Sequence, residues 1–235
     1  MLMQGITYNT MMGLVVGVII LMVPLFMRSL DVNPGRSVSG FGWGFIAAGG
    51  FLAFTGMHMT LTWPLEQIEG VFCCAVDNVT FGEPAAIYGL LTLIAGFAIL
   101  RAEDRAERGL RELDMVATLR PILYIAAVAG FAIVLFGIAG LHFGQWRPPT
   151  VEPIARLLAG NMIEPLMVFS MYVITGVAAI LSPFALTNRT VAKVFGVLAW
   201  IAGMAWIFLA FTLFYSHVGF FPWPFNNPEV MHPEL

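Results

Sequence analysis

The chain has 235 residues, of which 59% are hydrophobic and 11% are charged, and its formal net charge at pH 7 is -3. Soluble domains carry about 25% charged residues, so this composition excludes an ordinary soluble protein and indicates an integral membrane protein. There is no basic cluster with stacking aromatics, which argues against nucleic-acid binding. The sequence also contains no phosphate-binding loop, dinucleotide-binding glycine motif, G-x-S-x-G elbow or H-E-x-x-H zinc motif.

Six apolar stretches are long enough to cross a bilayer as helices, which takes about 20 mostly apolar residues. The predicted spans are residues 8–27, 40–63, 83–101, 120–143, 164–184 and 191–218. We therefore predict an all-α, polytopic membrane bundle of six transmembrane helices in a single domain over residues 1–235. The first span is not preceded by a basic segment or followed by an A-x-A site, so we interpret it as a retained helix.

The second and third spans each carry a distinctive pattern. The second is rich in glycine and alanine, and small side chains let helices approach closely in lipid, so we expect this span at the centre of the bundle. The third continues as "RAEDRAERGLRELD", whose alternating charges are typical of a solvated helix. We therefore expect the third helix to extend beyond the bilayer.

Arginine and lysine are unevenly divided between the two sides of the predicted bundle. One side carries Arg28, Arg36, Arg101, Arg105, Arg108, Arg111, Arg120, Arg189 and Lys193, and the other carries only Arg147 and Arg156. The positive-inside rule places the basic side in the cytoplasm. Both termini are then predicted to be extracytoplasmic, in a multi-pass protein of a cell membrane.

A short repeat divides the spans into pairs. The third span begins "NVTFGEP" and the fifth begins near "NMIEP", while the second, fourth and sixth apolar runs end on His58, His142 and His217. This pattern predicts three sequential helical hairpins related by a pseudo-repeat. Because odd spans begin outside and even spans end outside, the three histidines, Glu83 and Glu164 are all predicted at one depth.

Three imidazoles and two carboxylates at one depth suggest a metal centre. His58, His142, His217, Glu83 and Glu164 are ligand types that suit Fe, Cu or Zn. Glu83 and Glu164 are predicted either as ligands or as acid–base groups. With Fe or Cu the site would be redox-active, so if the protein is an enzyme we expect a metal-dependent oxidoreductase, oxidase-like or monooxygenase-like, rather than a hydrolase.

Other interpretations of the same residues remain open. A single interfacial histidine is well tolerated, and glutamate before proline is a common helix start. Two histidines could instead hold haem b, or the protein could be a non-catalytic subunit of a larger membrane complex or a homo-oligomer. A transporter is disfavoured because no charged or polar residue was found deep within a span. The adjacent Cys73 and Cys74 are read as small buried hydrophobes, with a soft-metal site or vicinal disulfide as alternatives.

Two short segments and the span layout also resemble a known family. The segments "GMHMTLTWPL" and "FGEP", together with six spans, are similar to an uncharacterised family of bacterial and archaeal membrane proteins known only as a domain of unknown function. The resemblance covers most of the chain and implies a multi-pass membrane protein. It implies no activity.

Overall fold

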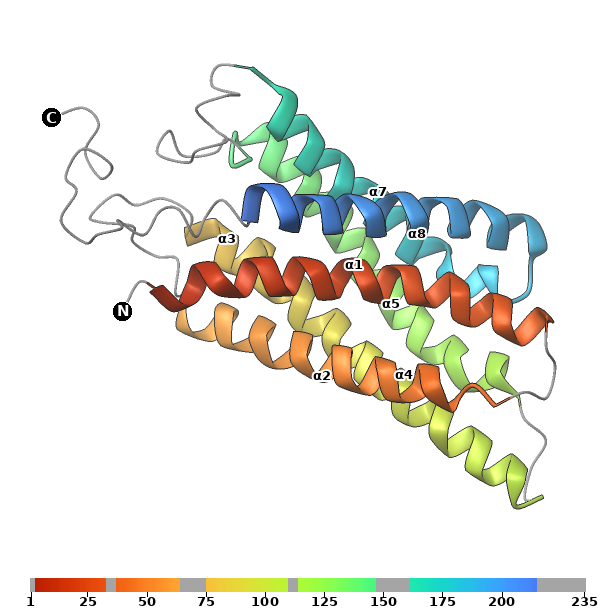
Figure 1. Cartoon of the computed structure of the whole chain (residues 1–235). Coiled ribbons are helices and arrows are strands. Elements are labelled where there is room, and N and C mark those ends of the chain that lie inside the picture. The colour runs from red at the N-terminus through yellow and green to blue at the C-terminus, as the bar shows by residue number, and fades with distance from the viewer. Residues whose placement is uncertain (1–2, 33–36, 64–74, 110–113, 147–160, 215–235) are drawn as a thin grey trace, which may run out of the picture.

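A computed structural model describes residues 3–32, 37–63, 75–109, 114–146 and 161–214, and every regular element in them is helical (Figure 1). The elements are α1 (Met3–Val32), α2 (Ser39–Thr62), α3 (Ala75–Thr80), α4 (Gly82–Glu107), α5 (Met115–His142), α7 (Ile163–Ala185), α8 (Arg189–Leu209) and the π-turn η1 (Ala210–Phe214). The all-α prediction is therefore confirmed.

Six helices are long and apolar enough to cross a membrane, as the sequence predicted. Helix α4 continues past the apolar stretch to Glu107 and extends beyond its neighbours at the lower right of Figure 1, in line with the predicted polar extension. The last predicted span, residues 191–218, begins two residues after the first residue of α8. Its final residues, 215–218, lie outside the described part of the chain. The short helix α3 was not predicted.

Side-chain caps fix two of the helix starts. The Asp114 carboxylate accepts a hydrogen bond from the Ala117 amide at 2.8 Å and begins α5. The Asn188 side chain accepts from the Thr190 and Val191 amides at 3.0 and 3.2 Å and begins α8. Such caps satisfy amides that lack a partner within the helix, so they set where each span enters the bundle.

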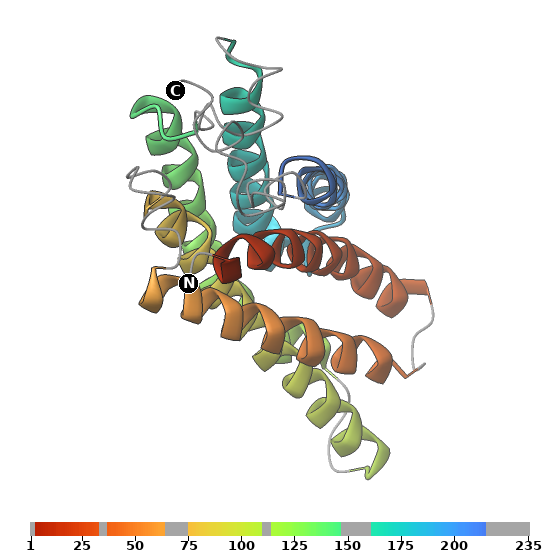
Figure 2. The same cartoon turned by 60° about the vertical axis from the view of Figure 1, so that its left-hand side comes forward.

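The six long helices form a closed ring in chain order, with α8 returning to contact α1. The most extensive contacts pair α2 with α4 and α5 with α7, and α1 pairs with α8. In Figure 2, α2 and α4 lie below α1, whereas α7 and α8 lie above it. The closest pairs therefore join the second helix of one predicted hairpin to the first helix of the next. Helix α2 is a member of this ring, not its centre.

Facing glycines explain why these three pairs are so close. They include Gly17 with Gly203, Gly49 with Gly89, and Gly130 with Gly176. A Cβ on Gly17, Gly49 or Gly130 would lie 2.7, 2.8 or 2.7 Å from the carbonyl oxygen of the facing glycine, closer than any side chain can approach. In a bilayer, where lipid tails are as apolar as the helix surface, such close backbone packing holds helices together.

The outward face of the ring is apolar. Trp43, Phe54, Val128 and Phe131 are among the large hydrophobic side chains that are well exposed on the bundle surface. A soluble monomer rarely exposes apolar area of this extent, whereas lipid tails would cover it. The exposed surface therefore agrees with the six candidate spans in indicating association with membrane lipid.

Candidate functional site

The two ends of the ring carry different residues. At the histidine end, on the left of Figure 1, α2 and α5 end with His58 and His142 nearby, and α4 and α7 begin with Glu83 and Glu164 in their first turns. At the opposite, arginine end, the described basic residues are Arg28, Arg101, Arg105, Arg108, Arg120, Arg189 and Lys193.

The predicted ligands at the histidine end differ in their surroundings. His58 is half-buried, and its Nδ1 lies 3.4 Å from the Thr62 hydroxyl, which donates to the His58 carbonyl at 2.7 Å. His142 is exposed, and its ring lies 4.8 Å from the Phe143 ring. Glu83 is half-buried, whereas Glu164 is only 6% exposed. Both carboxylates lie at the positive end of a helix dipole, which stabilises them.

The described residues contain no group of three or more histidine, cysteine, aspartate or glutamate side chains that could hold a metal ion. The structure thus places four of the five predicted ligands at one end of the ring but does not bring three of those four together. His217 lies outside the described residues, as do Cys73 and Cys74. The convergence of all five ligands therefore stays a prediction.

Four aromatic rings form a layer across the inside of the ring near the histidine end. This aromatic layer consists of Phe81, Trp146, Tyr172 and Trp206, with centroids of neighbouring rings 4.9 to 6.4 Å apart. The Tyr172 hydroxyl donates to the Thr80 carbonyl at 2.8 Å. Buried aromatic polar groups normally find such partners, and here the hydrogen bond ties α7 to the end of α3, just before α4 begins.

Two glycines allow Trp146 to join the aromatic layer. After α5 the chain turns at Gly144, whose φ is 71°, and Trp146 folds back along the helix that it has just left. Its indole Nε1 donates to the Gly137 carbonyl at 3.1 Å. A Cβ on Gly140 would lie 1.9 Å from Trp146 Cε2, so only glycine leaves room for the indole ring.

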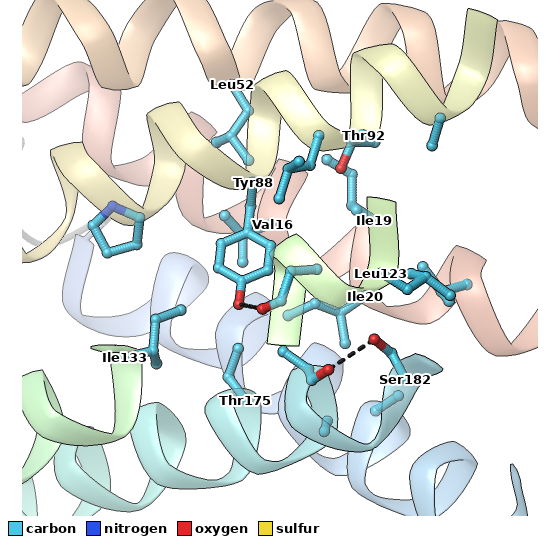
Figure 3. Close-up of a pocket in the computed structure, with 18 of the residues that line it drawn as sticks. Val16, Ile19, Ile20, Leu52, Tyr88, Thr92, Leu123, Ile133, Thr175 and Ser182 are labelled. Carbon is cyan, nitrogen blue, oxygen red and sulfur yellow. Dashed lines mark hydrogen bonds between the residues drawn. The ribbon is translucent and has the colours of Figure 1, made fainter. Parts of the chain in front are cut away.

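A cavity of about 210 Å³ lies inside the ring, lined by residues from all six long helices (Figure 3). Three of its hydroxyl groups are hydrogen-bonded to protein. Tyr88 donates to the Ala126 carbonyl and Ser182 to the Ala179 carbonyl, both at 2.7 Å. Thr175 accepts from the Trp206 indole at 3.0 Å. Because most of the other lining residues are apolar, the interior presents an almost wholly apolar surface.

The cavity is long and narrow. Its lining runs along α1 from Met12 to Met27, which at 1.5 Å per residue is about 22 Å. Phe81, Tyr172 and Trp206 of the aromatic layer also line it, so the layer limits the cavity toward the histidine end. The same volume in a compact shape would span far fewer turns of helix.

The arginine end contains a buried carboxylate with a clear structural role. Glu103 on α4 is 7% exposed and accepts hydrogen bonds from the Val38 amide and, at 3.4 Å, from the Ser37 hydroxyl. It thereby caps the start of α2 from the neighbouring helix, with its charge at the positive end of the α2 dipole. This contact fixes the α2–α4 pair at the end opposite His58.

Comparison with known proteins identifies a family. Residues 3–219 match the family described as protein of unknown function (DUF981). The chain belongs to the DUF981 family. The match includes all six spanning helices, so the resemblance expected from the His58 and Glu83 segments is confirmed for nearly the whole DUF981 chain. Neither the curated proteins nor the solved structures include a match to it.

Sequence reasoning missed the polar groups that line the cavity of this DUF981 protein. Tyr88, Thr92, Thr175 and Ser182 lie within spans, although the spans were interpreted as lacking polar residues at depth. The signal was present as uncharged hydroxyl residues on α4 and α7. It was missed because hydroxyl side chains are common in membrane helices, where they often bond to their own backbone.

Proposed function

We propose that this protein binds the hydrocarbon chain of a lipid in the cavity inside its helix ring. The observation that carries the proposal is a cavity of about 210 Å³ lined by apolar side chains from all six long helices. Small-molecule sites are typically concave and mostly apolar, with a small number of polar groups, and they occur between the helices of bundles. A lipid is the apolar ligand that the surrounding bilayer supplies in greatest amount.

The shape of the cavity favours an extended chain over a compact ring system. The volume of the cavity is about 210 Å³. That volume extends along about 22 Å of α1, between Met12 and Met27. A slender acyl or isoprenoid chain uses length rather than width, and it requires no polar partner from the cavity wall.

Native mass spectrometry of the protein released from its own membrane tests this proposal. Wild type is expected to carry a co-purified lipid. Ala178→Phe should greatly lower the lipid-bound fraction, because Ala178 lines the cavity and the added ring fills part of it. Val128→Phe is the matched control, since Val128 is 74% exposed on the outward face. Equal lipid retention by both variants would refute the proposal.

A metal centre at the histidine end is a second candidate function. The observation that favours it is the position of His58, Glu83, His142 and Glu164 at one end of the ring. These four and His217 are the proposed ligands, and Fe, Cu and Zn the proposed ions. This candidate retains the oxidoreductase hypothesis, with haem b as the alternative cofactor.

Metal analysis combined with an optical spectrum tests the second candidate. The expected result is stoichiometric Fe, Cu or Zn in wild type and its loss in Glu164→Gln and His142→Ala. His232→Ala is the matched histidine control, because His232 lies outside the six predicted spans and was not proposed as a ligand. A Soret band would favour haem. Metal retained equally by wild type and both ligand variants would contradict the ligand assignments.

A further inference from the structure

The lining of the cavity is uncharged from end to end. Within the described part of the chain, the residues that line it include no Asp, Glu, Lys, Arg or His. Toward the histidine end the lining contains rings of the aromatic layer, and toward the arginine end it contains Phe26, Phe45 and Leu119. These three pack in one apolar cluster with Val38 and Met115, at the starts of α2 and α5. Because an unpaired charge is costly to bury, this lining favours an uncharged ligand.

Threonine hydroxyls in helices often donate to their own backbone, which gives the hydroxyl proton a partner without any ligand. Five described threonines do so here, each donating at 2.7 to 2.9 Å to the carbonyl four residues earlier: Thr55, Thr60, Thr62, Thr118 and Thr212. None of the five lines the cavity. A cavity threonine without such a carbonyl partner has its proton available for a ligand.

Two threonines of the cavity lining depart from this pattern. Thr92 on α4 is half-buried, and its hydroxyl forms no hydrogen bond with any residue that the structure describes. Thr175 on α7 accepts from the Trp206 indole at 3.0 Å, but no described carbonyl accepts its own proton. Figure 3 shows both side chains among those that line the cavity. The cavity therefore offers two hydrogen-bond donors, which come from two different helices.

The two donors lie deep within the bundle. Thr92 follows Gly82, the first residue of α4, by ten residues, and Thr175 follows Ile163, the first of α7, by twelve. At 1.5 Å per residue they are about 15 and 18 Å from the histidine end of their helices, whereas the hydrocarbon core is about 30 Å thick. Both donors are thus near the middle of the membrane, far from phospholipid headgroups. A plain hydrocarbon chain would leave them unpaired there, which is unfavourable.

We infer that the ligand is an uncharged lipid that carries a carbonyl group, and that this carbonyl accepts a hydrogen bond from Thr92. This inference rests on the proposed lipid-binding function and adds the class of lipid. A carbonyl oxygen accepts hydrogen bonds and brings no charge, so it matches both the hydroxyl donor and the uncharged lining. Thr175 supplies a second donor on α7. An isoprenoid quinone and a fatty-acid ester both provide this chemistry.

Identification of the bound lipid tests its class. Lipid is extracted from wild type and from Ala178→Phe, each purified from its own membrane, and is analysed by mass spectrometry and ultraviolet absorption. The lipid that wild type retains and Ala178→Phe loses is expected to be uncharged and to contain a carbonyl. The absorption of a quinone ring separates a quinone from an ester. A charged phospholipid, or a hydrocarbon without a carbonyl, would overturn the inference.

A competition between two added lipids tests the role of Thr92. The full-length protein in phosphatidylcholine nanodiscs receives equal amounts of a fatty-acid methyl ester and an alkane of the same length, and native mass spectrometry measures what it retains. Wild type is expected to prefer the ester. Thr92→Val should lower the ester-to-alkane ratio about two- to tenfold, the effect of one hydrogen bond, and Thr92→Ser should keep it. Thr55→Val is the matched control, since the Thr55 hydroxyl bonds within α2 and does not line the cavity.

The outcomes separate this inference from the function on which it rests. Equal retention of ester and alkane by wild type, with both lost in Ala178→Phe, would overturn the carbonyl assignment alone. Both retained in Ala178→Phe would overturn the lipid-binding function itself. An ester preference that persists in Thr92→Val would overturn the role of Thr92. If Thr92→Val does not fold, wild-type thermal stability decides the question. The ester should raise it more than the alkane, because tighter binding to the folded state stabilises it more. Equal effects would overturn the inference.

Discussion

Replacing one glycine of an adjacent pair tests the close approach of α2 and α4. A Cβ on Gly49 would lie 2.4 Å from the Leu93 amide nitrogen and 2.8 Å from the Gly89 carbonyl oxygen, both rigid backbone atoms. Ordinary contact begins near 3.4 Å, so Gly49→Ala must separate the helices by about 1 Å. Overpacking of this kind costs about 1–3 kcal/mol, and the higher helix propensity of alanine offsets about 0.5–1 kcal/mol of it.

Gly50→Ala is the matched control. A Cβ on Gly50 would meet only Leu93 Cδ1, at 3.8 Å, so it gains helix propensity without a clash. For a chain of this size 1 kcal/mol shifts the melting temperature by about 2–4 °C. Thermal unfolding in detergent, followed by tryptophan fluorescence, should therefore show Gly49→Ala melting several degrees below wild type and Gly50→Ala at or above it. Equal melting temperatures for both variants would refute the close α2–α4 contact.

Three further substitutions probe the ends of the ring. Glu103→Ala should lower the free energy of unfolding by about 1.5–3 kcal/mol, because it removes the cap of α2. Glu107→Ala is the control and should have little effect, because Glu107 is exposed. Equal melting temperatures for the two variants would contradict the capping role of Glu103. Tyr172→Phe keeps the aromatic ring but loses the hydrogen bond to the Thr80 carbonyl. Chemical denaturation should therefore show a free energy of unfolding that is lower by about 1–3 kcal/mol. A variant as stable as wild type would argue against that hydrogen bond. Gly140→Ala should displace Trp146 and shift its fluorescence, and an unchanged emission spectrum would contradict the folded-back position of the indole.

The helices themselves could be predicted from the sequence because bilayer thickness sets their length. About 20 apolar residues are needed to cross the hydrocarbon core, and the observed helices α2, α5 and α7 follow the predicted spans closely at the histidine end. The helix ends at the arginine end were predicted less well, because α4 continues to Glu107 and α5 begins at Met115, whereas the predicted spans end at 101 and begin at 120. The short helix α3 was missed because six residues are too few to show a periodic apolar pattern.

Helix pairing was only partly readable. Glycines recur every seven residues on two spans, at Gly42, Gly49 and Gly56 on α2 and at Gly82, Gly89 and Gly96 on α4. This spacing indicates a continuous small face on each helix. The sequence does not say which two small faces meet, because that depends on how six helices close a ring. The expectation of a central second span failed for this reason.

The candidate site was harder to predict than the fold. Alternating span direction was sufficient to place His58, Glu83, His142 and Glu164 at one end of the bundle. Their convergence depends also on the rotation of each helix, and one residue changes the direction of a side chain by about 100°. His142 is exposed on α5 whereas Glu164 is buried on α7, a difference that residue spacing alone does not reveal. The cavity depends on side chains from six helices together and has no local sequence signal.

Closure of the ring by its first and last helices affects how the protein is made. During synthesis α1 enters the membrane before α8, and Gly17 meets Gly203 only after α8 has left the ribosome. Until then the nascent bundle has an open side facing the surrounding lipid, and a chain stalled before Arg189 lacks one wall. Synthesis of α8 is therefore the step that completes the wall of the cavity, and it gives a bilayer lipid an opportunity to be trapped as the protein matures.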